Sequence, residues 1–262
     1  MKSKPVVLVF AGHDPSGGAG IQADIESLTR QGCHAATVIT SLTVQDTRDV
    51  IDILPVDPAQ VITQARAILE DMPVAAFKLG LLGTVELIEV IHTILTDYPE
   101  IPVILDPVLA TGRGTDLGEA GVVDALRVLL LPMTGILTPN SLEARALTPG
   151  ADTLSASALA LLDQGVDYAL ITGSHENTPQ VVNRLYHDQR QLESFTWERL
   201  PHQYHGSGCT LAASIAAHVA QGQEPVEAIR RAQAFTWKAL RAGYRPGLGQ
   251  YLPDRGFEDS TD

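Results

Sequence analysis

Residues 5–24 read PVVLVFAGHDPSGGAGIQAD, an apolar run that ends in a glycine-rich loop and leads into a helical pattern. The run at 5–12 predicts a buried strand, and the residues near 19–31 predict a helix. A strand, a glycine loop and a helix in this order are typical of α/β folds, which bind ligands at the carboxyl ends of their strands. This stretch therefore predicts an α/β fold with a ligand site near the loop.

The loop does not match the two common nucleotide-binding motifs. It lacks the G-x-x-x-x-G-K-[ST] pattern of a P-loop, and Gly17, Gly18 and Gly20 do not form G-x-G-x-x-G. The acidic residue expected about 20 positions after a dinucleotide motif is also missing, because that region is apolar. A dinucleotide oxidoreductase is therefore disfavoured. By itself, the loop fits a tight turn that allows close helix packing equally well.

The alternation of apolar runs and helical patterns continues along the chain. Near-continuous apolar strands separated by helices indicate a mostly parallel sheet that is covered on both faces. At 181–197, residues alternate around a polar turn, which predicts an antiparallel hairpin at one sheet edge. We expect one domain over 1–262, with a core from about 5 to 255 and a frayed acidic tail. The other predicted strands are 35–42, 74–80, 101–106, 134–139 and 168–173, and the other predicted helices are 59–72, 85–95, 209–221 and 225–242.

The composition argues against several kinds of partner. The formal net charge of −13 argues against nucleic acid, because phosphate backbones are bound by clustered Lys and Arg. No stretch approaches the roughly 20 apolar residues of a membrane span, so no membrane partner is expected. Cys33 and Cys209 are far apart and form neither a disulfide framework nor a zinc pattern. With no signal-peptide pattern near residue 1, these features predict a cytoplasmic protein.

Polar residues follow several predicted strands at the same edge of the sheet. Gln45 could pair with the edge of a heterocycle through its donor and acceptor groups, although a loop glutamine is commonly just solvated. Asp106 ends the strand at 101–106. Asn140 and Glu143 are spaced for a capping box at a helix start. The other interpretation is that Asp106 and Glu143 hold hydrated Mg²⁺.

The stretch HGSGCT at 205–210 precedes a helix with a narrow apolar face. The free N–H groups around Gly206, Ser207 and Gly208, together with the helix dipole, form an anion hole suited to a transferring phosphoryl group. The same positive field predicts a lowered pKa for Cys209, whose thiolate could accept a proton from a substrate hydroxyl. The alternative is a small buried cysteine at a helix start.

Seven stretches together resemble a known family. GHDPSGGAGIQADIES, TSLTVQD, KLGLLG, ILDPVL, TPNSLEA, ITGSH and HGSGCTLAASIAA occur in the order and spacing of the ribokinase-like vitamin kinases. The match is best to the hydroxymethylpyrimidine/phosphomethylpyrimidine kinases of thiamine biosynthesis and runs from about 5 to 255. The resemblance implies a three-layer α/β/α sandwich, a homodimer, and ATP with Mg²⁺. It also implies successive phosphorylation of 4-amino-5-hydroxymethyl-2-methylpyrimidine, an aminopyrimidine alcohol, and of its monophosphate.

The resemblance assigns a role to each matched residue. Cys209 stands where most ribokinase relatives carry an Asp base, and Gly206, Ser207 and Gly208 belong to the anion hole. The pyrimidine pocket would be lined by Gly12, Gln45 and Leu81. The nucleotide site would include Asn140, Thr172 and Gly173, and Glu143 completes an N-x-x-E motif that organises Mg²⁺ through water, with Asp106 beside it.

The chain departs from the commoner family pattern at several positions. Leu81 replaces a frequent Met, Thr172 replaces a frequent Lys, His202 stands at another common Lys, and ATGRGTD at 110–116 replaces a Ser-Gly-Asp stretch. One possible phosphate-binding cation is therefore absent, and Arg113 or His202 could supply the missing charge. These changes put the details of the second phosphorylation in question more than the first.

Two other functions stay open at this stage. A pyridoxal/pyridoxine kinase would share the glycine loop and the cysteine, although Gln45 favours an aminopyrimidine. A non-catalytic nucleotide- or vitamin-binding protein is disfavoured by the presence of Asp106, Glu143 and Cys209.

Overall fold

A nine-stranded sheet runs through the part of the chain that the computed structural model describes, residues 4–109 and 120–258. The strands are β1 (Val6–His13), β2 (His34–Gln45), β3 (Val50–Pro55), β4 (Val74–Leu79), β5 (Val103–Leu105), β6 (Ile136–Leu137), β7 (Tyr168–Ile171), β8 (Gln180–His187) and β9 (Arg190–Glu198). Their order is β3-β2-β1-β4-β5-β6-β7-β8-β9, and the six from β2 to β7 are parallel. The expectations for 110–116, Arg113 included, and for the end of the acidic tail lie outside the described residues.

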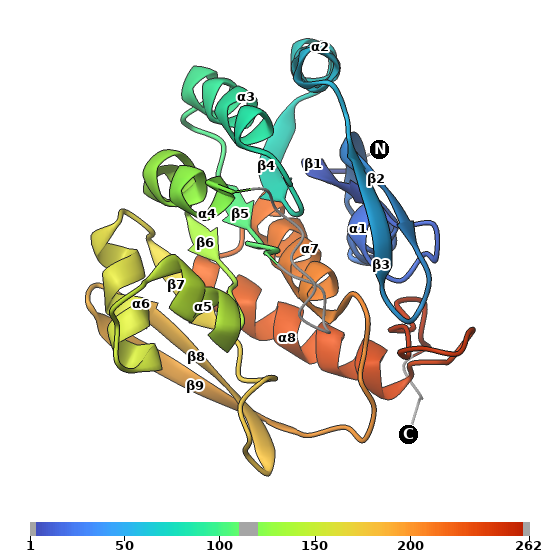
Figure 1. The fold of residues 1–262 in the computed structure, drawn as a ribbon, viewed down its shortest axis with the longest axis vertical. Coiled ribbons are helices and arrows are strands. Elements are labelled where there is room, and N and C mark those ends of the chain that lie inside the picture. The colour runs from blue at the N-terminus through green and yellow to red at the C-terminus, as the bar shows by residue number, and fades with distance from the viewer. Residues whose placement is uncertain (1–3, 110–119, 259–262) are drawn as a thin grey trace.

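Helices cover both faces of the sheet (Figure 1). One face packs against α1 (Gly20–Arg30), α7 (Ser207–Ala220) and α8 (Pro225–Arg241). The other packs against α2 (Pro58–Asp71), α3 (Val85–Asp97), α4 (Val122–Ala125), α5 (Ser141–Leu147) and α6 (Leu154–Asp163), with a π-helical turn at Leu126–Leu130 and a 3₁₀ turn at Leu131–Met133. The predicted three-layer α/β/α fold with a mostly parallel sheet is confirmed.

The apolar run of β1 explains how the layers are held together. Val6, Leu8 and Phe10 pack into the core beneath α2 and α3, whereas Val7 and Val9 pack into the core beneath α1 and α7. Successive side chains of a strand point to opposite faces, so a strand buried on both sides needs an apolar residue at nearly every position.

The antiparallel hairpin predicted at 181–197 is confirmed as β8 and β9 at one edge of the sheet. Its turn residues Asp188 and Gln189 have φ values of 49° and 57°. The opposite edge is also antiparallel, because β3 pairs with β2, and the sequence analysis missed this strand. Most β3 side chains are exposed, so its sequence lacks the continuous apolar run that marks a buried strand.

Helix α7 begins two residues earlier than predicted. Gly206 is its N-cap with φ 84°, so Cys209 is the third residue of the helix and not its first. A glycine can adopt this left-handed conformation without strain, so the chain turns into the helix directly after it. Within residues 4–109 and 120–258, no helix combines the length and hydropathy needed to cross a membrane.

Candidate active site

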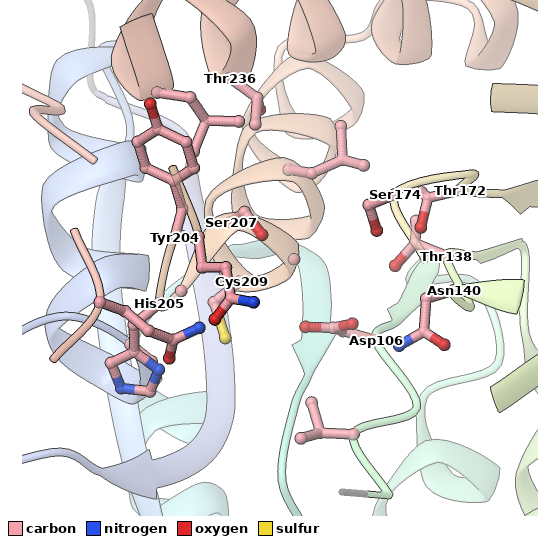
Figure 2. Close-up of a pocket in the computed structure, with 18 of the residues that line it drawn as sticks. Asp106, Thr138, Asn140, Thr172, Ser174, Tyr204, His205, Ser207, Cys209 and Thr236 are labelled. Carbon is pink, nitrogen blue, oxygen red and sulfur yellow. The ribbon is translucent and has the colours of Figure 1, made fainter. Parts of the chain in front are cut away.

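A cavity of about 820 Å³ lies where the parallel strands end (Figure 2). Its walls come from the loops after β1, β2, β4, β5, β6 and β7 and from the start of α7. The predicted site residues that line it are Gly12, Gln45, Leu81, Asp106, Asn140, Glu143, Thr172, Gly206, Ser207, Gly208 and Cys209. The structure therefore brings together eleven of the twelve, and Gly173 is the exception.

The first turn of α7 forms one wall of this cavity. The N–H of Thr210 donates to the carbonyl oxygen of Gly206 at 3.0 Å, which is the first hydrogen bond of the helix ladder. The N–H groups of Ser207, Gly208 and Cys209 precede that bond and have no intrahelical acceptor. They are positioned as the predicted anion hole, and the helix dipole adds to their attraction for negative charge.

The glycine loop after β1 packs directly against this helix start. A Cβ atom on Gly206 would lie 1.9 Å from the carbonyl oxygen of Gly18, so no larger residue fits there. The backbone N–H of Gly20, the first residue of α1, is close enough to the Cys209 sulfur to lower the pKa of its thiol slightly. Cys209 therefore stands between the N-termini of α1 and α7.

Two residues that sequence reasoning missed hold the glycine loop in shape. The carboxylate of Asp14 accepts the N–H groups of Ser16 and Ala19, both at 2.8 Å, and it contacts His205 Nε2 at 2.9 Å. Burial favours a raised pKa for Asp14, but the hydrogen bond and charge of His205 outweigh it and lower the pKa to about 2. The motifs GHD and HGSGC contain both residues, but their 191-position separation conceals the pair.

The prediction of a thiolate at Cys209 near neutral pH is wrong for the protein without ligands. Burial raises the pKa of the Cys209 thiol to about 12; Lys78 opposes this shift, while Asp106 and Asp24 reinforce it. The residue keeps some surface open to the cavity, but the surrounding walls exclude most bulk solvent. The helix dipole is a modest effect, and here desolvation with two nearby carboxylates outweighs it.

Asp106 and Glu143 are buried carboxyl groups whose negative charges are not fully compensated by nearby cations. Burial raises the pKa of Asp106 to about 6; Lys78 lowers it and Asp24 raises it further. Burial, followed by the charge of Asp106, raises the pKa of Glu143 to about 8. Lys78 is already paired with Asp24, at 2.9 Å with both side chains fully buried. A bound cation would therefore relieve an electrostatic cost at Asp106 and Glu143.

These two carboxylates fit a hydrated Mg²⁺ ion. Asp106 Oδ2 is buried and accepts no hydrogen bond from the described residues. Figure 2 shows the Asp106 carboxylate directed into the space between Cys209 and Asn140. No group of three or more His, Cys, Asp or Glu side chains in the described ranges is arranged to bind a metal. This donor set suits Mg²⁺, which usually keeps several waters and takes one or two carboxylates plus substrate phosphates.

The N-x-x-E motif also forms the capping box of α5. Asn140 Oδ1 accepts the N–H of Leu142 at 2.9 Å and that of Glu143 at 3.0 Å, while Glu143 Oε2 accepts the N–H of Asn140 at 2.8 Å. Both side chains still line the cavity. The structural and the metal-binding interpretations are therefore compatible, since the cap fixes the direction of the Glu143 carboxylate.

The predicted substrate residues gather at one end of the cavity. A Cβ atom on Gly12 would lie 2.8 Å from Ser41 Oγ and 3.2 Å from Leu81 Cδ2. The absence of a side chain at Gly12 therefore allows Leu81 to pack close to the backbone of β1. Gln45 is the last residue of β2 and borders the same space. A flat ring between an apolar wall and an amide would fit the chemistry of these groups.

Elsewhere the cavity is lined by residues that the sequence analysis named and by others that it missed. Thr172 lines it, but Gly173 packs on β8, where a Cβ atom would lie 2.3 Å from the carbonyl oxygen of Val182. Asn183 Oδ1 accepts the N–H of Gly173 at 3.0 Å and thereby ties this turn to the hairpin. His202 lines the cavity and stacks on Tyr251 with ring centroids 3.8 Å apart. Further lining residues are Asn183, Trp197, Gln233, Thr236 and Trp237.

The fold and the position of the site define the class of protein, a ribokinase-like α/β protein with its site at the strand ends. A family model described as phosphomethylpyrimidine kinase matches residues 14–254, so the chain belongs to that family. It is 35% identical to the hydroxymethylpyrimidine/phosphomethylpyrimidine kinase of Haemophilus influenzae, over 95% of this chain and 96% of that one.

Two further similarities qualify this result. The chain is 38% identical to the thiamine biosynthesis bifunctional protein ThiED of Geobacter sulfurreducens, but it spans only 50% of that longer protein, against 93% of itself. It also resembles the structure of an ADP complex of Bacillus subtilis pyridoxal kinase, with a TM-score of 0.88 and 28% identity over 97% of this chain and 98% of that one.

Proposed function

We propose that this chain transfers the γ-phosphoryl group of ATP to the hydroxymethyl group of 4-amino-5-hydroxymethyl-2-methylpyrimidine, and then phosphorylates the monophosphate, in thiamine biosynthesis. The observation that carries the proposal is the convergence of the α7 anion hole, Cys209 and the Asp106–Glu143 pair in one cavity. The family match over 14–254 supports the pyrimidine as the acceptor.

The residues divide the chemistry among them. The substrate hydroxyl oxygen forms a bond to the γ-phosphorus while the bond from that phosphorus to the leaving oxygen of ADP breaks. The Cys209 thiol first releases its own proton to solvent as the substrates bind, and the resulting thiolate then accepts the hydroxyl proton. The N–H groups of Ser207, Gly208 and Cys209 stabilise the charge on the transferring group. When bound, Mg²⁺ would supply positive charge that offsets the negative charge of the phosphates. It would also offset the Asp106 carboxylate, whose negative charge raises the pKa of the Cys209 thiol.

A second candidate is pyridoxal phosphorylation, which the similarity to a pyridoxal kinase structure supports. The amide of Gln45 at the substrate end favours the aminopyrimidine, because it can both donate to and accept from a ring with an amino group and a ring nitrogen. His202 lines the cavity and is a candidate for the phosphate-binding cation of the second step.

We further propose that the protein forms a homodimer and that it is located in the cytoplasm. An exposed apolar patch on the β2–β3 edge supports a homodimer, and its members are Leu42, Val44 and Leu54. Two unpaired thiols, at Cys33 and Cys209, support a reducing compartment.

An ADP-release assay with three acceptors tests the function. The purified chain receives ATP and Mg²⁺ with the aminopyrimidine alcohol, its monophosphate or pyridoxal. We expect kcat/KM for the pyrimidine alcohol to exceed that for pyridoxal by at least about tenfold. A preference for pyridoxal would assign the second candidate, and no ADP release with any acceptor would indicate a binding protein.

A further inference from the structure

The C-terminal segment lies against the stretch that leads into the anion hole. The N–H of Tyr251 donates to the carbonyl oxygen of Gln203, and the N–H of His205 donates to that of Tyr251, both at 2.9 Å. Residues 250–255 therefore support the backbone immediately before Gly206, although they belong to no motif of the sequence analysis.

Arg255 in this segment is a buried cation, with 3% of its surface exposed. Its Nε donates to Thr210 Oγ1 at 2.9 Å, its Nη1 donates to Glu26 Oε2 at 2.9 Å, and its Nη2 donates to the carbonyl oxygen of Gly18. One planar group thus joins the glycine loop, the first turn of α7 and helix α1. A lysine ammonium lacks the rigid fork needed to hold all three acceptors.

The Arg255 guanidinium lies next to the point where the glycine loop, at Gly18, packs against Gly206 at the start of α7. A Cβ atom on Gly206 would be 2.9 Å from Arg255 Nη2 and 1.9 Å from the Gly18 carbonyl oxygen. Thr210, which accepts from Arg255, donates its own hydroxyl to the carbonyl oxygen of Gly206 at 2.8 Å. Arg255 does not line the cavity, so it can act on the reaction only through these partners.

We propose that Arg255 is a positioning residue that fixes the α7 anion hole relative to the glycine loop; this rests on the proposed phosphoryl transfer. Donors of an anion hole stabilise the transition state only when they are aimed at the position where charge develops. A displacement of about 1 Å can cost up to about a hundredfold in rate. Loss of Arg255 releases Gly18 and Thr210 together, and with them the backbone of Gly206.

Arg30 provides a matched control for the attachment of the C-terminal segment. Its Nη2 donates to the carbonyl oxygen of Phe257 at 2.9 Å, and its guanidinium lies 5.7 Å from the centre of the Phe257 ring. Arg30 thus joins α1 to the same segment, but at the last turn of the helix and away from the glycine loop. Arg30→Met weakens the attachment of the segment without touching the anion hole.

The experiment compares Arg255→Met, Arg255→Ala and Arg30→Met by steady-state kinetics and by hydrogen exchange of peptides covering 204–210. For Arg255→Met we expect kcat to fall by about tenfold to a hundredfold, with KM for ATP and the pyrimidine alcohol within about twofold, and faster exchange at 204–210. Arg30→Met should keep both kcat and that exchange near the unsubstituted values. Guanidinium ion at non-denaturing concentration should restore part of the activity of Arg255→Ala, whereas KCl should not.

Three results would overturn the proposal: unchanged kcat in Arg255→Met, equal losses in both Arg variants, or a kcat loss that equals the loss of folded protein. If Arg255→Met does not fold, Thr210→Val decides, because it removes one acceptor of Arg255 and the contact to Gly206. Unchanged kcat and exchange in Thr210→Val would then contradict the proposal. If the unsubstituted chain shows no kinase activity, the proposed function fails, while the exchange comparison still tests the positioning of 204–210.

Discussion

Cys209 holds its proton tightly in the protein without ligands, because burial raises the pKa of its thiol to about 12. Its thiolate, once formed, is correspondingly basic, and the groups that govern its formation are Lys78, Asp106 and Asp24. A thiol with these neighbours suits proton transfer that is coupled to substrate binding, and not a permanently charged nucleophile.

Cys209→Ala tests this role. We expect kcat to fall by about a hundredfold or more while KM for the pyrimidine alcohol changes little, because removal of a general base affects the transition state and not ground-state binding. Cys33→Ala is the matched control, since Cys33 is buried against α7 and outside the cavity. Steady-state kinetics measure both, and normal turnover of Cys209→Ala would remove the cysteine from the mechanism.

The two acidic groups predict a pH-dependent Mg²⁺ requirement. The pKa values of Asp106 and Glu143 are raised to about 6 and about 8, so protons compete with a cation below these values. The Mg²⁺ concentration for half-maximal rate should therefore fall as pH rises from 6 to 8. Glu143→Gln should flatten the upper part of this dependence. A requirement that is constant across the range in the unsubstituted chain contradicts the metal assignment.

At the scale of elements, a comparison of the glycines at the two ends of α7 distinguishes the cost of a strained backbone from the cost of a steric clash. Gly206 and Gly222 have φ values of 84° and 79°, but a Cβ atom meets the Gly18 carbonyl oxygen at Gly206 and nothing within 4 Å at Gly222. Gly222→Ala should cost about 1–2 kcal/mol of unfolding free energy from its φ alone. Gly206→Ala should cost more and also lower kcat. Urea unfolding and kinetics check both, and equal effects would contradict the close contact.

Local patterns predicted the elements whose residues carry their own signal. The apolar run of β1 and the polar turn of the β8–β9 hairpin are such cases. Strand β3 is mostly exposed, so its sequence does not show the regular pattern of apolar residues that a buried face requires. Helix α6 was also missed: its apolar residues are spread around it and not confined to one face, although Thr153 caps its start.

The candidate site was predicted in its motifs but not in its supporting contacts. The Asp14–His205, Asp24–Lys78 and Arg255–Gly18 pairs join residues 191, 54 and 237 positions apart. No local pattern can reveal such pairs, because only the folded topology brings their partners together. The raised pKa of Cys209 was missed for the same reason, since it depends on how deeply other elements bury the thiol.

At the scale of the whole molecule, the β2–β3 edge predicts self-association. Leu42 and Leu54 are cross-strand partners and are 44% and 63% exposed, and Val44, two residues along β2, extends the apolar surface on the same face. Leu54→Asp should shift the chain from dimer to monomer in sedimentation velocity. Val128→Asp is the control, because this residue is 72% exposed and belongs to the π-helical turn Leu126–Leu130, which is not part of the β2–β3 edge. A monomeric unsubstituted chain would contradict the homodimer.

The most direct test of the central claim is a ³¹P NMR time course with the purified chain, ATP, Mg²⁺ and the aminopyrimidine alcohol. The account predicts the growth of a phosphomonoester signal together with ADP, followed by a diphosphate signal from the same pyrimidine. It also predicts that neither signal grows at a comparable rate with Cys209→Ala. A spectrum in which ATP persists and no pyrimidine phosphoester appears would contradict the account.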